Sequence, residues 1–153
     1  MNNYLTPEEY LPHDKPMVLL DEVLHVDKNT AVTRCIVDSD HVLKPFIEKD
    51  GVPTFITLEL LAQSVGIWSG YFSIKNGQKK CPLGMVIGGR DYENQTEFFK
   101  TGSILEIEVT KIMHDDNIGS FEGCIKENGV IVSTGRVNVV KVSEEQFSQL
   151  FKR

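Results

Sequence analysis

The sequence has few cysteines and no cysteine motif. Its 153 residues include only Cys35, Cys81 and Cys124, and no two of them have a CxxC spacing. An odd number of cysteines without such a spacing argues against a disulfide framework and against a zinc site. The pattern is typical of reduced core residues, so we expect a cytoplasmic protein that uses no metal and no cofactor.

Long apolar runs, a targeting segment and an excess of positive charge are also missing. No apolar run approaches the ~20 residues that cross a bilayer, and the opening MNNYLTPEEY lacks the apolar core of a signal peptide. The 16 basic and 22 acidic side chains give a net charge of −6, whereas a nucleic-acid-binding protein usually has a basic face. Without repeats or low-complexity segments, a chain of this length predicts a single domain over residues 1–153.

One long apolar stretch, Gly51–Gly70, stands out from this background. Its sequence is GVPTFITLELLAQSVGIWSG, and Glu59 is its only charged residue. Apolar side chains recur with the 3.6-residue period of a helix, at Leu58, Leu61, Ala62, Val65, Trp68 and Phe72. Because further apolar residues cover most of the remaining surface, we expect a buried helix that Thr54 caps.

Glu59 shares one face of this helix with Gln63, Gly66 and Gly70, which follow it at i+4, i+7 and i+11. A buried, unpaired carboxylate is costly, so Glu59 should be partnered, near water or more readily protonated than usual. A carboxyl group of that kind can act as a general acid. The alternative is a carboxylate stabilised by the helix dipole with its tip in water, and the residues alone leave both interpretations open.

The rest of the chain is mostly strands. We expect short helices that begin at Thr6 and Ser143, and a hairpin turn at Asn128-Gly129. The expected strands cover residues 17–26, 30–37, 83–92, 104–113, 120–127 and 130–142. This order predicts an α+β fold in which one antiparallel sheet wraps around one helix. The edge of such a sheet commonly pairs with a second copy, so we expect a homodimer or a larger dimer-based oligomer.

Three segments resemble the β-hydroxyacyl-ACP dehydratases of the FabZ type. LPHDKPMVLLDEVL (11–24) is similar to their opening motif LPHRxPxLLxDxV, PFIEKDGVPTFITLELLAQSVG (45–66) to their central helix, and FFKTGSILEIEV (98–109) to their PVxPGDxLxxEV segment. The LPHxxPMxLLD start and the GxPxxxxLExxAQ helix resemble more narrowly the aryl-polyene type, which is ApeP-like. The resemblance covers roughly residues 10–140 and implies the hotdog fold.

The resemblance implies the loss of water from a 3-hydroxyacyl thioester on an acyl carrier protein, giving the trans-2-enoyl thioester in fatty-acid or aryl-polyene-type biosynthesis. Such a reaction needs an acid, a base and donors at a helix N-terminus. Glu59 occupies the family's acid position. Gln63 would orient Glu59 or its water, with a helix-to-helix hydrogen bond as the structural alternative. Thr54 stands where the family usually has glycine, and its N–H could polarise the thioester carbonyl.

The base is the point at which the sequence departs from the family. The family's histidine, fourteen residues before the acid, is replaced here by Pro45. We expect His13, held in the proline-bounded LPH loop, to form the catalytic pair with Glu59, from one subunit or from two. His41 is the alternative base. The remaining histidines, His25 and His114, are expected at the solvated surface.

Further residues complete the expected substrate site. Phe55 and Gly66 join Thr54 and Gln63 as substrate-binding candidates, and the Gly66/Gly70 line could border an acyl tunnel or simply pack tightly. Asp21 and Arg90 are supporting candidates for which structural roles are preferred. A basic rim for the acidic carrier could come from loop lysines, namely Lys44, Lys49, Lys79, Lys80 and Lys100.

Two other functions fit the same sequence. A hotdog thioesterase would use a carboxylate near the same helix, and the LPH motif favours the dehydratase over it. A non-catalytic hotdog partner of a paralogous dehydratase would explain the missing histidine at position 45.

Overall fold

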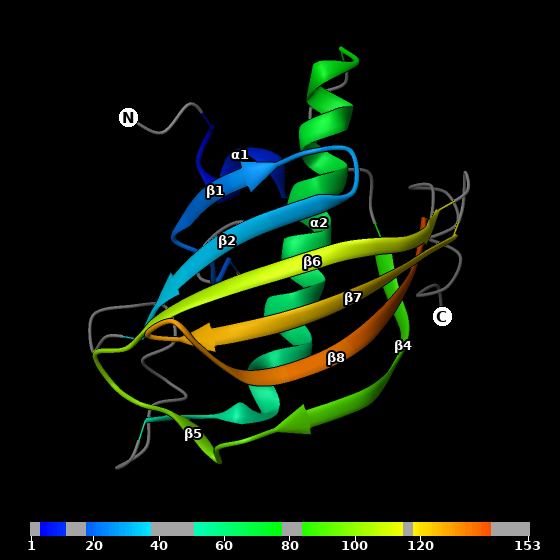
Figure 1. Ribbon diagram of the computed structural model, residues 1–153. Coiled ribbons are helices and arrows are strands. Elements are labelled where there is room, and N and C mark those ends of the chain that lie inside the picture. The colour runs from blue at the N-terminus through cyan, green and yellow to red at the C-terminus, as the bar shows by residue number, and fades with distance from the viewer. Residues whose placement is uncertain (1–3, 12–17, 38–50, 78–83, 115–117, 142–153) are drawn as a thin grey trace, which may run out of the picture.

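The computed structural model describes residues 4–11, 18–37, 51–77, 84–114 and 118–141. Within them, a 6-stranded antiparallel sheet curves around one long helix, as Figure 1 shows. The sheet has the strand order β1-β2-β6-β7-β8-β4, and its strands are β1 Glu22–Val26, β2 Thr30–Ile36, β4 Gly84–Asn94, β6 Ile104–His114, β7 Ile118–Glu127 and β8 Val130–Lys141. The other elements are α1 Pro7–Tyr10, the paired short strands β3 Val52–Pro53 and β5 Phe98–Phe99, the 3-10 turn η2 Thr54–Ile56, and α2 Thr57–Lys75. The α+β fold expected from the sequence is therefore confirmed.

The sheet buries one face against α2 because its strands alternate. On β6, Leu105, Ile107 and Val109 are buried, while the residues between them are partly exposed. Phe121 and Ile125 extend the same inner layer onto β7. None of the described helices is both long and apolar enough to cross a membrane.

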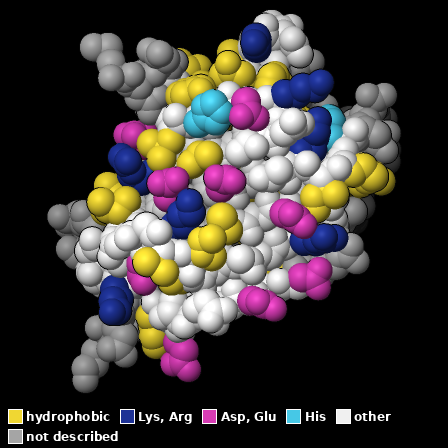
Figure 2. Space-filling view, in the orientation of Figure 1, with side chains coloured by type: hydrophobic (Ala, Val, Ile, Leu, Met, Phe, Trp, Pro, Cys, Tyr) yellow, Lys and Arg dark blue, Asp and Glu magenta, His cyan; other side chains and the backbone are white. Residues whose placement is uncertain are grey.

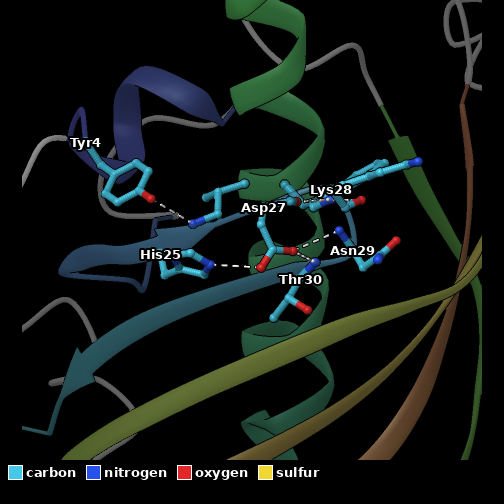
Figure 3. Close-up of polar contacts among 8 residues, drawn as sticks. Tyr4, His25, Asp27, Lys28, Asn29 and Thr30 are labelled. Atoms are coloured by element: carbon cyan, nitrogen blue, oxygen red, sulfur yellow. Dashed lines mark hydrogen bonds and ion pairs between the residues drawn. The ribbon is translucent and has the colours of Figure 1, made fainter.

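The two predicted hairpins are confirmed. At the β7–β8 turn, Asn128 and Gly129 have φ values of 50° and 90°, which the Asn-Gly pair tolerates and which two-residue hairpin turns require. At the β1–β2 turn, Asp27 Oδ1 accepts hydrogen bonds from the N–H groups of Asn29 and Thr30, both at 2.9 Å (Figure 3). Such contacts from an aspartate to its own turn fix the loop conformation.

The β1–β2 turn is also tied to the rest of the protein. The indole N–H of Trp68, on α2, donates to the carbonyl oxygens of Asp27 (3.1 Å) and Lys28 (3.2 Å). At the end of the preceding strand, the N–H of Val26 donates to the hydroxyl of Tyr4 at 3.1 Å (Figure 3). The turn is therefore anchored to the central helix and to the N-terminal segment.

The first strand begins later than expected. The strand was expected to start at residue 17, but β1 starts at Glu22. The residues just before it are buried and lie outside the strand, namely Val18, Leu19 and Leu20. The Leu19 N–H donates to the side chain of Gln63 instead of to a neighbouring strand. An apolar run predicted as a strand is therefore a core segment that crosses the central helix.

The central helix also begins later than expected. Thr54 does not cap it: its hydroxyl donates to the carbonyl oxygens of Thr96 (3.2 Å) and Glu97 (3.3 Å), and α2 starts after the 3-10 turn. The predicted stop is confirmed, because Gly77 has a φ of 88° and its N–H bonds to the carbonyl of Ile74. The expected Thr6-capped helix is also present as α1, and the expected helix at Ser143–Phe151 lies outside the described residues.

Candidate functional site

Glu59 is the third residue of α2, and its side chain is exposed in the chain. The sheet covers only one side of this first turn, since Thr57 and Leu60 are buried while Leu58 is 38% exposed. The expectation of a buried carboxylate is therefore wrong for the chain by itself. The alternative from the sequence, a carboxylate in the first helical turn with its tip in water, describes the geometry, and the helix dipole stabilises its charge there.

Gln63 holds this carboxylate, as the sequence predicted. The Gln63 side chain is only 3% exposed, and its Nε2 donates to Glu59 Oε1 at 3.0 Å. Its Oε1 accepts the N–H of Leu19 at 2.9 Å. Because a backbone N–H can only donate, the amide oxygen must face Leu19 and the amide NH2 must face Glu59. Gln63 therefore presents a fixed donor to one oxygen of the carboxylate.

Leu19 is the contact that sequence analysis missed. It follows closely on the LPHDKP sequence (11–16), so Gln63 links the helix to the chain segment that continues from that sequence. Every residue type except proline has a backbone N–H, so the sequence does not show which of these groups will bond to a side chain. The N–H of Leu19 can reach Gln63 because Leu19 is not part of a strand. His13, His41 and Pro45 lie outside the described residues.

Thr54 is positioned differently from the expectation. Its N–H donates to the carbonyl of Glu97 at 3.0 Å, so this group is already used within the chain and does not point a free donor at a substrate carbonyl. The pairing of β3 with β5, which brings Thr54 beside Glu97, is the physical reason. Phe55 lies in η2, and its side chain is outside the described part of the structure.

The glycine line of α2 packs against α1. A Cβ on Gly66 would lie 2.6 Å from Leu11 Cδ2, and a Cβ on Gly70 would overlap the carbonyl group of Tyr10. Tight packing, the alternative to an acyl tunnel, therefore describes both glycines in this chain. The two helices lie side by side in Figure 1.

Several other candidates have structural contacts. Asp21 Oδ2 accepts the N–H of Ile36 at 2.7 Å, which supports the preferred structural role. His25 is exposed, as expected, and pairs with Asp27 at 2.9 Å. His114 is exposed, as expected; it is the last residue of β6, and its ring packs edge-on against Trp68. Lys100 is exposed; the side chain of Arg90 and the other four lysines are outside the described residues.

A polar network that the sequence did not reveal lies at the start of α2. The Thr57 hydroxyl donates to Asn94 Oδ1 at 3.5 Å, and the buried Ser133 hydroxyl donates to the same oxygen at 2.6 Å. These three residues come from α2, β4 and β8, so only the folded sheet brings them together. No group of three metal-binding side chains occurs in the described parts of the chain.

The outer face of the sheet carries a separate cleft of about 480 Å³ that includes Glu108, Glu122, Cys124 and Arg136. Figure 2 views the molecule from this side and shows acidic and basic side chains interspersed. Arg136 pairs with Glu122 at 2.9 Å. Desolvation raises the pKa of the Cys124 thiol, with a smaller contribution from Glu108, so the thiol is a poor nucleophile. This cleft and α2, which carries Glu59, lie on opposite sides of the sheet.

Comparison with known proteins identifies the fold. The chain resembles a solved structure of the dehydratase heterocomplex ApeI:P from Xenorhabdus doucetiae, with 37% identity over 99% of this chain and 100% of that chain and a TM-score of 0.93. It also resembles a hypothetical thioesterase protein with coenzyme A from Streptococcus pneumoniae TIGR4 (12% identity, 80% of this chain and 85% of that chain, TM-score 0.58). A mutant of the phenylacetic acid degradation protein PaaI from Thermus thermophilus is similar at 13% identity, over 79% of this chain and 92% of that chain, with a TM-score of 0.57. The last two likenesses show the fold alone, and the fold is the hotdog.

The family comparison covers almost the whole chain. No curated protein sequence matches it. Residues 5–152 match the model of the ApeP-like family, described as ApeP dehydratase. The resemblance seen in the LPHxxP start and the central helix is thereby confirmed, and the chain belongs to the ApeP-like family of hotdog dehydratases.

Proposed function

We propose that this dehydratase removes water from a 3-hydroxyacyl thioester carried by an acyl carrier protein and that Glu59 is its general acid. The observation that carries the proposal is the Glu59–Gln63 pair: an accessible carboxylate in the first turn of the central helix, held by a buried amide of fixed orientation. An acid that must meet a substrate needs both accessibility and a fixed direction.

The reaction follows from this arrangement. A base takes the α-proton, the electrons of the C–H bond form the C=C bond, and the C–O bond of the 3-hydroxyl group breaks. Glu59 gives its proton to the departing oxygen, which leaves as water. Because Gln63 donates to Oε1, we assign the proton delivery to Oε2. The positive end of α2 favours the negative charge that develops on the thioester oxygen.

The base in this proposal is His13, with His41 as the alternative. Its partner, Glu59, is connected through Gln63 to the chain segment of Leu19, which lies six residues after His13 in the sequence. A side-chain bridge between the helix and this segment would keep acid and base at a constant separation, which is what a two-residue proton transfer requires.

The direct test is mass spectrometry of a 3-hydroxyacyl-ACP incubated with the wild type and with Glu59→Gln, His13→Ala and His41→Ala. We expect the wild type to remove one water and Glu59→Gln to lose at least about 100-fold in rate, the usual minimum for a general acid. The exposed Glu93→Gln change on β4 is the matched control and should keep full activity. Loss of activity in His41→Ala but not in His13→Ala would make His41 the base, and full activity in Glu59→Gln would refute the proposal.

A second candidate role is that of a subunit in a heterocomplex. The structure from Xenorhabdus doucetiae is a dehydratase heterocomplex, and this chain has proline at the position of the FabZ-type histidine. Under this role the chain forms a complex with a second dehydratase subunit and does not dehydrate the substrate alone. Size-exclusion chromatography with light scattering, followed by the same assay with and without the second subunit, distinguishes the two roles.

A further inference from the structure

Tyr92 lies on β4 and has a buried hydroxyl group. The residue as a whole is partly exposed, yet Oη is buried and has no hydrogen-bond partner in the described part of the chain. Tyrosine normally does the opposite, keeping its hydroxyl hydrated or bonded while the ring is buried. An unpaired buried hydroxyl is costly, and phenylalanine would fill the same space without that cost. The hydroxyl therefore needs an explanation.

Two backbone features hold the ring in this position. Gly135 on β8 has no side chain, and a Cβ there would overlap the Tyr92 ring. Asp91 has a φ of 59°, within an irregularity of the β4–β8 pairing between Arg90 and Glu93. Aspartate is one of the few non-glycine residues that adopt this left-handed conformation readily, so the bulge is the informative feature: bulges commonly redirect a side chain next to a functional site. Both features are consistent with a ring that is placed for a purpose.

The ring lies beside the first turns of α2. Asn94, two residues after Tyr92, is bonded to Thr57, the first residue of α2. On the other side, Gly135 pairs with Gly123 of β7, and the space over Gly123 is filled by the Leu61 side chain. Tyr92 is therefore near the part of the helix that carries Glu59.

The surroundings define what the hydroxyl can bind. Burial raises the pKa of Tyr92, so the group stays protonated at neutral pH and is available as a donor. Its partner must be an acceptor that can be brought beside apolar side chains, since Tyr92 packs against the core cluster that includes Leu61. The carrier side of a thioester is polar and faces water, whereas the acyl end is the part that can be buried.

We propose that Tyr92 Oη donates a hydrogen bond to an oxygen atom on the acyl chain of the substrate, so that the enzyme prefers acyl groups with a polar oxygen beyond the 3-hydroxyl. This inference rests on the proposed function. It makes Tyr92 a specificity-determining residue, since a plain alkyl chain would leave the hydroxyl unpaired and an oxygenated chain would satisfy it.

The test compares two series of 3-hydroxyacyl-ACP thioesters, with chains of six to twelve carbons that end in either a methyl or a hydroxyl group. We expect the wild type to have a kcat/KM about tenfold higher for the hydroxyl-ended member at one chain length or more, the effect of one buried hydrogen bond. Tyr92→Phe should abolish or reverse that preference. Tyr71→Phe, a change in a partly buried tyrosine on α2, should keep it.

Stability gives a second, independent readout that needs no substrate. Removing an unpaired buried hydroxyl should leave the melting temperature unchanged or raise it by about 2–4 °C. A lower melting temperature in Tyr92→Phe would mean that the hydroxyl is already bonded within the protein, and this would overturn the proposal. A wild type without the preference, or a preference that survives in Tyr92→Phe, would also overturn it. Dehydration of neither series by the wild type would instead refute the proposed function.

Discussion

The two halves of the central helix differ in what they contact. The first half, residues 57–64, carries polar side chains that form individual hydrogen bonds. Glu59 is bonded to Gln63, and Ser64 is bonded to Thr33 at 2.8 Å. The second half, residues 65–75, carries rings and glycines. Trp68 packs on Phe72 and Phe121 with ring centroids 5.3 and 5.5 Å apart.

This difference separates the part of α2 that fixes the helix in the fold from the part that carries the proposed catalytic residue. The second half is fixed by close contacts with α1 and with the β1–β2 turn, and none of these contacts requires a charged helix residue. The first half is then free to place an exposed carboxylate, because the helix is already anchored elsewhere. A polar site on a rigid element keeps its geometry better than one on a loop. Changes in the second half should therefore affect stability, and changes in the first half should affect activity.

We call the second half of α2, residues 65–75, the anchor. The strongest test of the anchor is the pair of variants Gly70→Ala and Gly66→Ala. The added methyl group at position 70 meets the backbone carbonyl of Tyr10, which cannot move without α1, while at position 66 it meets the flexible end of Leu11. We expect Gly70→Ala to lose about 3 kcal/mol of unfolding free energy and Gly66→Ala about 1 kcal/mol. Urea denaturation measures both, and equal losses would show that the two contacts are equally rigid.

The next test separates the two functions of Gln63. Gln63→Leu removes both hydrogen bonds and leaves the buried N–H of Leu19 unpaired, at a cost of about 1–3 kcal/mol. Gln63→Glu keeps an acceptor for Leu19 but replaces the donor to Glu59 with a second carboxylate. Both variants should lose most dehydratase activity and should also lose stability. The stability loss of Gln63→Glu comes from a second carboxylate buried beside Glu59, so it should shrink as the pH falls, whereas the loss in Gln63→Leu should not. Measuring kcat and urea denaturation on each provides the comparison, and retained activity in Gln63→Glu would contradict the role assigned to the donor.

A smaller effect is expected from Trp68→Phe in the anchor. Phenylalanine keeps part of the ring packing but loses the indole N–H that donates to Asp27 and Lys28. The loss should be about 1–2 kcal/mol, the value of a hydrogen bond plus some packing. Hydrogen exchange at the β1–β2 turn should become faster, while kcat of the dehydratase reaction stays within about twofold, since the first half of α2 is untouched.

The sequence predicted the architecture because its strongest signals are local. The strand over residues 104–113, the Asn128-Gly129 turn and the long central helix are each decided by neighbouring residues, and all three were confirmed. The helix start was wrong because the Thr54 hydroxyl had competing partners. These are the carbonyl groups of Thr96 and Glu97, just before β5 and more than forty residues away in the sequence. Long-range competition of this kind has no local signature.

For the site, the sequence predicted the spacing but not the environment. The i, i+4 relation placed Glu59 and Gln63 on one helix face, and the resemblance implied that Gln63 orients Glu59 or its water; the structure has a direct hydrogen bond between the two side chains. The exposure of Glu59 depends on how far the sheet covers the first turn of α2, which periodicity cannot reveal. Leu19 and Tyr92 were missed for a related reason: a backbone N–H and an unpaired hydroxyl become visible only once the surrounding chain is placed.

The smallest expected effect concerns the β1–β2 turn, to which Trp68 ties the second half of α2. The hydrogen bond from His25 and the turn N–H groups hold the pKa of Asp27 below its ordinary value of 3.8. A carboxylate with a lowered pKa stabilises the fold above that ordinary value, and this stabilisation is lost as the pH falls through the folded-state pKa. Because both side chains are about half exposed, the contribution at neutral pH should be less than about 1 kcal/mol. Asp27→Asn should therefore be slightly less stable than the wild type at pH 7 by urea denaturation, and the difference should shrink toward pH 3. A difference that stays constant with pH would show that the hydrogen bonds of the turn, and not the charge of Asp27, hold the turn against the anchored half of the helix.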